Sequence, residues 1–482
     1  MSGIIAANRL IQPTFELEAE GIDGFYIASQ FEGSLSADVG DGDHVRLLST
    51  NPNGYVGEMY IRDDLYTGPL KIRGNLNTCK SLSFNANSNT NKGLIKFDIS
   101  EFAKMPNLEQ AGVSHPTVYP TGDISSLPKK LKSIFFSRGR LEGNIKDISK
   151  DVKAFVIATD NNLTGDMLDL PLLIEAFNVG GDNSITGTFS VLPKSIKEFS
   201  FATNHGSFSS NFLEIKEGLQ SFSLNGNAIN IVGDLAELPT SVHKFTIAGN
   251  AKVTGDISSL NSKYSELAVY CENSITGDIA YIPPFLYYFV VEGSNTLFGN
   301  IEMLSSNLST FQVKGFNTIT GNIVNISSSI YYILLYGNNT VYGDVQNLNR
   351  LLKVLDIRGE NQMYGNVTYL PENIIEITIT GNNTLYGDLG SIKRMSVIRI
   401  GGYATCHYIS TVWPSPMYEM SYTPKTTGLT EAQIDQLIID LSVPDWDAFR
   451  KIDLRGANAP RTSASDAAIL VLQSKSVTVL TN

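Results

Sequence analysis

Pairs of apolar residues separated by a single residue recur along most of the chain. Ile333 and Leu335 form one such pair, and Ile330 stands three positions before it. Apolar residues at every second position are typical of a β-strand with one buried face. The pattern therefore predicts a short strand in each unit, with the pair directed inward. From residue 199 onward the pairs are Phe199/Phe201, Phe222/Leu224, Phe245/Ile247, Leu267/Val269, Phe289/Val291, Phe311/Val313, Ile333/Leu335, Leu355/Ile357, Ile377/Ile379 and Ile398/Ile400.

Glycines that mostly precede Asp or Asn set the interval between these units. From Gly233 to Gly387 they recur every 22 residues. The interval from Gly187 to Gly233 is 46 residues, which corresponds to two slightly longer units, one without its glycine near Ser209 or Ser210. A fixed period of this length predicts a solenoid, because one coil cannot bury its apolar edge alone and similar coils must stack. The glycines are Gly122, Gly143, Gly165, Gly187, Gly233, Gly255, Gly277, Gly299, Gly321, Gly343, Gly365 and Gly387.

The repeat unit reads L-x-x-φ-x-φ, then an Asn-rich stretch, then φ-x-Gly-Asp-φ-x-x-L, where φ is apolar. It resembles the leucine-rich repeat family, and "NNLTGDMLDLP" from Asn161 is similar to the plant-type motif N-x-L-T-G-x-I-P-x-x-L. The resemblance covers about Leu82 to Gly402, with Phe, Ile, Val and Tyr at many positions where the family has Leu. We therefore expect an α/β-type solenoid, mostly β, with leucine-rich-repeat-like coils of about 22 residues, a small N-terminal β module and a C-terminal α/β cap.

One Asn per unit stands where the chain is expected to leave the strand and turn. A buried turn exposes backbone groups that need partners, and an amide side chain can donate to one neighbouring coil and accept from another. We interpret this file as a structural ladder; a glycan or metal site is the alternative. The ladder comprises Asn273, Asn295, Asn317, Asn339, Asn361 and Asn383.

The stretch before the array alternates apolar and polar residues in "GSLSADVGDGDHVRLL" and "GEMYIRDDLYTGPLKIRGN". It predicts a small antiparallel β module over residues 21–75. Asp38, Gly40, Asp41 and Gly42 resemble the W-D-F-G-D-G turn of polycystic-kidney-disease-type sandwich domains, although Val39 replaces the aromatic residue. A plain hairpin turn is the alternative. No Glu follows at the spacing of a calcium loop, so we expect no metal there.

The last part of the chain, residues 425–482, predicts an α/β cap on a solenoid that we place at residues 76–424. Thr430 is expected to N-cap a helix with Ile434, Leu437, Ile438 and Leu441 on one face. "FRKIDLRG" predicts a strand, "SASDAAILVLQSK" a second helix with a Ser N-cap, and "VTVLT" a final strand. Solenoids need such a cap because an open coil end presents unpaired strand edges and apolar side chains.

Composition restricts the partners. The 482 residues carry a formal net charge of −12 and include no basic block, which argues against binding to nucleic-acid phosphates. No window approaches the roughly 20 apolar residues of a membrane span, and the amino end does not predict an export signal. Cys79, Cys271 and Cys406 lie far apart in sequence, so we expect free thiols in a reducing cytoplasm rather than a disulfide or metal site.

The ends of the chain resemble a second group of proteins. "GLTEAQIDQLIIDL" and "LRGANAPRTSASDAAILVLQSKSVTVLTN" are similar to the carboxyl ends of fibre-like virion proteins of tailed bacteriophages of gut Bacteroidetes, including crAss-like phages. In those proteins a GDG-containing β module, a repeat array and this cap occur together. The resemblance covers about Gly21 to Gly74 and Gly428 to Asn482.

This resemblance implies a structural protein of the phage virion, a head fibre, tail fibre or capsid decoration, assembled in the host bacterial cytoplasm. Residues 1–20 are then expected to attach the chain to other virion proteins, while the repeat surface faces a host glycan or protein. Because fibres are usually symmetric multimers, we expect a homo-oligomer, either a dimer or a trimer.

We expect no enzymatic activity, no catalytic residues and no cofactor. The five histidines are scattered, and the chain contains no G-x-S-x-G, HExxH or P-loop motif. A glycan depolymerase on a repeat scaffold is the first alternative, with Asp356 and Glu376 on neighbouring strands as its acids. In a solenoid we expect these acids instead to form a solvated face paired with Arg358 or Lys353. A cytoplasmic repeat protein that binds a host partner is the second.

Two files of side chains are candidates for the contact surface. Residues beside the inward pairs are expected on the outer face of the strands, where exposed Tyr suits sugar rings or a protein partner. A second file of aromatic residues stands immediately before the repeat glycine, where a stacked, stabilising ladder is the other interpretation. The first file comprises Tyr288, Val290, Glu292, Tyr332, Leu334, Tyr336, Asp356 and Arg358; the second comprises Phe298, Tyr342, Tyr364 and Tyr386.

Overall fold

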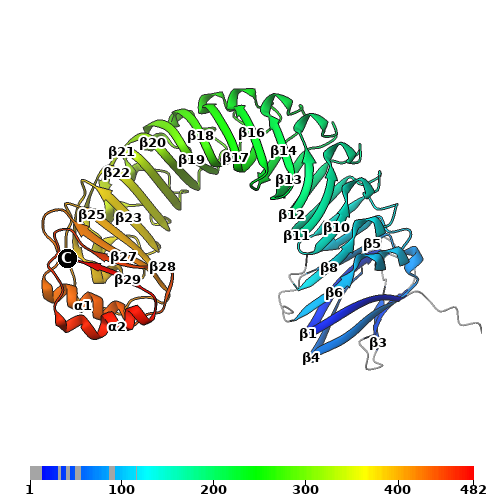
Figure 1. Ribbon diagram of the computed structural model, residues 1–482, viewed down its shortest axis with the longest axis horizontal. Coiled ribbons are helices and arrows are strands. Elements are labelled where there is room, and N and C mark those ends of the chain that lie inside the picture. The colour runs from blue at the N-terminus through cyan, green and yellow to red at the C-terminus, as the bar shows by residue number, and fades with distance from the viewer. Residues whose placement is uncertain (1–13, 31–33, 39–43, 49–55, 86–92, 115–116) are drawn as a thin grey trace, which may run out of the picture. The chain divides into compact units, whose positions relative to one another are not determined.

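The computed structural model describes residues 14–30, 34–38, 44–48, 56–85, 93–114 and 117–482 (Figure 1). The chain forms two compact units. The first is Met1–Val232 with Ala248–Asn250, and the second is Gly233–Ile247 with Ala251–Asn482. The division between them falls within the predicted solenoid.

The first unit begins with antiparallel strands. β1 (Thr14–Gln30) pairs with β4 (Val56–Gly74), and β2 (Ser34–Asp38) pairs with both β3 (His44–Leu48) and β4. β1 starts before position 21 and buries Phe15 and Leu17. Residues 39–43, with most of the predicted GDG turn, and residues 1–13 of the predicted attachment segment lie outside the described residues.

Coils of parallel strands follow in the first unit. β1 also pairs with β5 and β6, so the antiparallel strands adjoin the first coil directly. The strands are β5 (Ser81–Asn85), β6 (Leu94–Asp98), β7 (Gln110–Val113), β8 (Val118–Asp123), β9 (Ser133–Phe136), β10 (Arg140–Asn144), β11 (Ala154–Asp166), β12 (Ala176–Gly187), β13 (Glu198–Thr203), β14 (Ser207–Asn211), β15 (Ser221–Asn225) and, ending in the second unit, β16 (Ile229–Asp234).

The second unit continues the coils. Its strands are β17 (Lys244–Asp256), β18 (Glu266–Asp278), β19 (Tyr288–Asn300), β20 (Thr310–Asn322), β21 (Tyr332–Asp344), β22 (Val354–Asn366), β23 (Glu376–Gly381), β24 (Thr384–Asp388), β25 (Val397–Gly402), β26 (Thr405–His407), β27 (Met417–Pro424), β28 (Trp446–Leu454) and β29 (Thr478–Thr481). The prediction of a mostly β, leucine-rich-repeat-like solenoid is confirmed. The inward pairs, such as Ile333 and Leu335, are fully buried and line up with their equivalents in the next coil.

Each coil contains more strand than the sequence predicted. In β18 to β22 one continuous run of 13 residues holds two segments, separated by an irregularity around the ladder Asn. The second segment ends at the Asp or Asn after the repeat glycine, and its sequence was not predicted to be a strand. It forms because the equivalent segments of adjacent coils pair with one another.

A short 3-10 helix follows the repeat glycine in each coil. The Asp or Asn after the glycine accepts a hydrogen bond from the backbone N–H two residues later, as Asp256 does from Ser258 at 2.8 Å. This is a helix N-cap, and it satisfies a donor that the short helix leaves unpaired. At the coil without its glycine, Ser210 takes that position, and its hydroxyl accepts from the Phe189 N–H at 3.0 Å.

The carboxyl end closes the second unit (Figure 1). The sheet runs on through β25, β27, β28 and β29, with α1 (Glu431–Leu441) and α2 (Asp466–Ser474) beside it. Thr430 caps α1 in a reciprocal arrangement with Gln433, and Ile434 is buried as predicted. Ser465 precedes α2 but does not cap it, because its hydroxyl donates instead to Asp435 at 2.6 Å. All three cysteines are free thiols.

Candidate binding face

The outward positions of the first strand segments in the second unit form three parallel files, which together we term the strand face. Residues on the face alternate with the buried pairs, so each strand contributes one residue to each file. The middle file runs Ala268, Val290, Gln312, Leu334, Asp356, Thr378, Arg399, Ser421 and Asp453. Two positions earlier, the first file includes Tyr288, Tyr332 and Glu376, and two positions later the third includes Tyr270, Glu292, Lys314, Tyr336 and Arg358.

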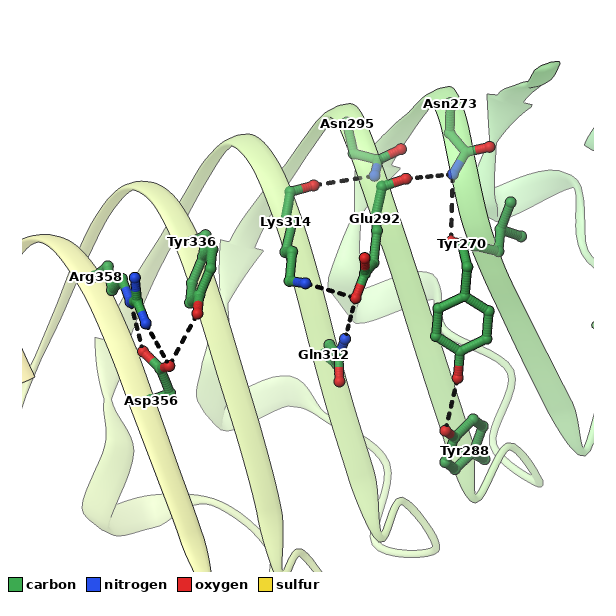
Figure 2. Close-up of polar contacts among 11 residues, drawn as sticks. Tyr270, Asn273, Tyr288, Glu292, Asn295, Gln312, Lys314, Tyr336, Asp356 and Arg358 are labelled. Carbon is green, nitrogen blue, oxygen red and sulfur yellow. Dashed lines mark hydrogen bonds and ion pairs between the residues drawn. The ribbon is translucent and has the colours of Figure 1, made fainter. Parts of the chain in front are cut away.

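A cluster on β21 and β22 brings three of the predicted contact residues together (Figure 2). The Tyr336 hydroxyl donates to Asp356 Oδ2 at 2.9 Å. Arg358 donates to both oxygens of the same carboxylate, from Nε at 2.9 Å and from Nη2 at 3.0 Å. Its guanidinium also lies over the Tyr336 ring, 4.2 Å from the centroid. These contacts hold the aromatic ring and the cation in one arrangement.

Two further contacts extend this network toward the amino end of the face (Figure 2). Lys314 pairs with Glu292 at 2.7 Å, and Gln312 donates to the same carboxylate. One coil earlier, the hydroxyls of Tyr270 and Tyr288 lie 2.9 Å apart. Tyr288 is therefore part of the strand face but belongs to a different contact from the Tyr336 cluster.

The prediction of outward residues was wrong in part. Val290 and Leu334 are buried although they point away from the core, and the Asp356 carboxylate is buried as well. All three belong to the middle file, in which Ala268 and Thr378 are buried as well. Tyr288, Tyr332, Tyr336 and Arg358 belong to the flanking files and are half-buried. These four side chains therefore form part of the accessible surface.

The Asn ladder holds the backbone beneath the third file. Asn317 is fully buried, accepts from the Leu297 N–H at 2.9 Å and donates to the Tyr336 carbonyl at 3.0 Å. Asn295 donates in the same way to the Lys314 carbonyl at 3.0 Å, and Asn273 to the Glu292 carbonyl (Figure 2). Each of these amides thus fixes the next strand at a residue whose side chain belongs to the strand face.

All six predicted ladder residues are buried, and five of them accept a backbone N–H from the preceding coil. Two of them, Asn339 and Asn383, bury an Nδ2 that has no hydrogen-bond partner among the described residues. The ladder begins earlier in the chain than predicted. Asn161 and Asn183 in the first unit make the same bonds, accepting from Leu141 at 3.0 Å and Leu163 at 2.9 Å.

The second aromatic file lies on the other strand segment of each coil and is not brought together with the strand face. Tyr342, Tyr364 and Tyr386 are exposed, and each follows a buried apolar residue. Within the described part of the chain their rings make no aromatic contact and their hydroxyls no hydrogen bond. The interpretation of this file as a stacked ladder is therefore wrong, and its residues project singly from the surface.

A groove of about 450 Å³ opens on the strand face between β22 and β28. Three cations line it, namely Arg358, Arg399 and Lys451. Arg399 donates to Thr378 at 3.1 Å and to Glu419 at 2.5 Å. The groove was not predicted from the sequence. The repeat register contained a signal for it, because Arg399 occupies the same repeat position as Asp356.

Burial raises two pKa values beside the groove. It raises the pKa of the Glu376 carboxyl, with Arg399 opposing the shift and Asp356 adding to it. Burial also raises the pKa of the Tyr336 hydroxyl, and the Asp356 charge raises it further. Tyr336 therefore keeps its proton and remains the donor to Asp356.

The described ranges contain no cluster of three or more His, Cys, Asp or Glu placed to hold a metal ion. Neither helix of the described chain is long and apolar enough to cross a bilayer.

The stacked coils, their repeated Asn ladder and the strand face define a leucine-rich-repeat-like solenoid. No family model and no curated protein match the chain. Among solved structures, the functional domain of InlJ from Listeria monocytogenes is similar at 15% identity, over 76% of this chain and 77% of that one, with a TM-score of 0.40. The leucine-rich repeat protein LIC12759 from Leptospira interrogans is similar at 15% identity, over 79% and 80% of the two chains, with a TM-score of 0.31. At these identities the likeness concerns the fold alone.

Proposed function

We propose that this chain is a non-enzymatic binding protein whose strand face in the second unit contacts a partner. The observation that carries the proposal is the Tyr336–Asp356–Arg358 cluster, in which a ring and a guanidinium are held at the surface by a buried carboxylate. Fixed aromatic and Arg side chains lose little freedom on binding and are common anchors of interfaces. Leucine-rich-repeat scaffolds suit this task because every coil adds one residue to each file.

The resemblance of the chain ends supports a more specific role as a structural protein of a tailed-phage virion, as a head fibre, tail fibre or capsid decoration. In this role the amino-terminal region attaches to other virion proteins, the chain forms a dimer or trimer, and the solenoid presents its strand face to a host glycan or protein. Assembly takes place in the bacterial cytoplasm. Mass spectrometry of purified particles should detect the chain, and its absence from particles would exclude the virion role.

The binding role is tested with particles that carry substituted chains. Tyr332→Ala combined with Tyr336→Ala should reduce adsorption to host cells, because both side chains belong to the strand face. Tyr342→Ala combined with Tyr364→Ala is the matched control, since these residues are exposed on the other strand segment. If only the control variant lost adsorption, the second aromatic file would be the contact surface instead.

One observation favours a second candidate, a glycan depolymerase. Glu376 has a raised pKa, and the charge of Asp356 contributes to that shift, as in a pair of acids with separate roles. Against it, Asp356 is bound by both Tyr336 and Arg358. Incubation with host capsular polysaccharide distinguishes the two functions. New reducing ends that disappear in Glu376→Gln, with an unchanged melting temperature, would establish the depolymerase.

A further inference from the structure

We infer that the groove between β22 and β28 binds an acidic polysaccharide, a sugar chain that carries anionic groups. This inference deepens the proposed function, since it names the ligand class of the strand face. The chain as a whole has a formal charge of −12, so a surface where cations predominate is a local feature that needs its own explanation.

The groove presents cations outward and carboxylates inward. Each of the three cations is paired with a carboxylate: Arg358 with Asp356 on β22, Lys451 with Asp453 on β28, and Arg399 on β25 with Glu419 on β27. The cationic side chains are 40%, 22% and 37% exposed, whereas their carboxylate partners are 12%, 9% and 6% exposed. A ligand that enters the groove therefore meets the positive ends of all three pairs, although the pairs themselves are balanced in charge.

Arg358 retains a donor for a ligand. Arg358 uses Nε and Nη2 on Asp356, and among the described residues its Nη1 has no hydrogen-bond partner. A guanidinium already oriented by a carboxylate loses little freedom when it binds an anionic oxygen pair, which it matches in geometry. Hydroxyl groups complete the lining, from Thr378, Thr380, Ser421 and Thr423.

Sugar chemistry fits this groove better than an acidic peptide. A peptide that binds by strand addition needs an open sheet edge. Here β22 is paired on both sides, by β21 and β23, and β27 is paired by β25 and β28, so the groove floor offers no edge. The groove instead matches an acidic glycan. Its hydroxyls suit sugar hydroxyls, the half-buried Tyr336 ring beside Arg358 suits a sugar ring face, and its outward cations suit the anionic groups.

The test titrates the full chain with an oligogalacturonate, with the same oligomer fully methyl-esterified, and with a poly-glutamate peptide. We expect the charged oligomer to bind, with affinity falling as salt rises, and the neutral ester and the peptide to bind far more weakly. Lys451→Gln should weaken binding roughly tenfold, because a hydrogen bond between charged groups is worth about that factor. Arg358→Gln combined with Lys451→Gln should weaken it further.

Lys252→Gln is the matched control, since it removes one exposed positive charge from the second unit outside the groove. Thermal melts establish that each variant is folded. If the double variant does not fold, the test relies on Lys451→Gln alone. Equal binding of the ester, stronger binding of the peptide, equal loss with Lys252→Gln, or no binding of the charged oligomer would each overturn the inference. The proposed function would still stand if the neutral ester bound at the same residues, and it would fall separately if strand-face substitutions left adsorption unchanged.

Discussion

The Asn ladder yields a prediction that separates two of its members. Replacing Asn317 by Leu keeps the bulk of the side chain but removes both hydrogen bonds of the amide. The Leu297 N–H and the Tyr336 carbonyl then lose the partners that lie at 2.9 Å and 3.0 Å in the native protein. A polar group left unpaired on burial costs roughly 1–3 kcal/mol, so we expect Asn317→Leu to destabilise the second unit by roughly 2–6 kcal/mol.

Asn339→Leu should cost less, although the residue is equally buried and stands at the same repeat position. Only the Ile319 N–H, which bonds Asn339 Oδ1 at 3.0 Å, loses its partner. The substitution also removes a buried Nδ2 that has no partner among the described residues. The expected loss is therefore at most roughly 1–3 kcal/mol, the cost of one unpaired group. Tyr342→Ala, at an exposed side chain, should cost about 0.5 kcal/mol or less.

Thermal melts rank the three variants, and hydrogen exchange locates the damage. Because a solenoid couples neighbouring coils, its unfolding need not be two-state, and a local probe is needed beside the global one. The Leu297 amide should exchange faster in Asn317→Leu but not in Asn339→Leu. If Asn339→Leu proved as damaging as Asn317→Leu, the bond to the Tyr336 carbonyl would contribute nothing.

Two more predictions concern charge and capping. Hydrogen bonds from Arg455 lower the pKa of Asp453 from 3.8 to about 2. The ionised carboxylate therefore stabilises the fold by about 2 kcal/mol above pH 3.8, and this stability is lost as the pH falls toward 2. Melting curves of the native chain and Asp453→Asn should therefore differ most near neutral pH and converge near pH 2; a difference independent of pH would contradict the assignment. Asp256→Ala removes a cap on the Ser258 N–H and should cost about 1 kcal/mol in urea unfolding, whereas Thr188→Ala, at the equivalent position without a cap bond, should cost less.

The period of the sequence was sufficient to predict the coils and the position of the ladder. Both depend on the stacking of equivalent residues in register, and the repeat period gives that register directly. The carboxyl-terminal cap could also be predicted, because Thr430 and the apolar face of its helix are local signals. The second strand segment could not. Its residues include the ladder Asn and the repeat glycine, which disfavour a strand in isolation, and only pairing with the adjacent coils makes them extended.

The contacts on the strand face were harder to predict, because they join residues of different coils. Tyr336 and Asp356 form a side-chain hydrogen bond between adjacent strands, and so do Tyr270 and Tyr288. Repeat register shows that such residues are neighbours, but the direction of a long side chain decides which bond forms. The same limit applies to Val290, which is buried although its position in the strand directs it away from the core.

The ladder explains how the face can vary from coil to coil while the fold stays constant. Asn273, Asn295 and Asn317 hold the carbonyls of Glu292, Lys314 and Tyr336, and a carbonyl is the same whatever side chain its residue bears. The third file therefore accepts an acid, a base and an aromatic residue in three consecutive coils, whereas the ladder residues that bond to them are all Asn. Single substitutions on the strand face can therefore change its side chains without loss of the backbone bonds beneath it. Substitutions of these three Asn residues remove those bonds.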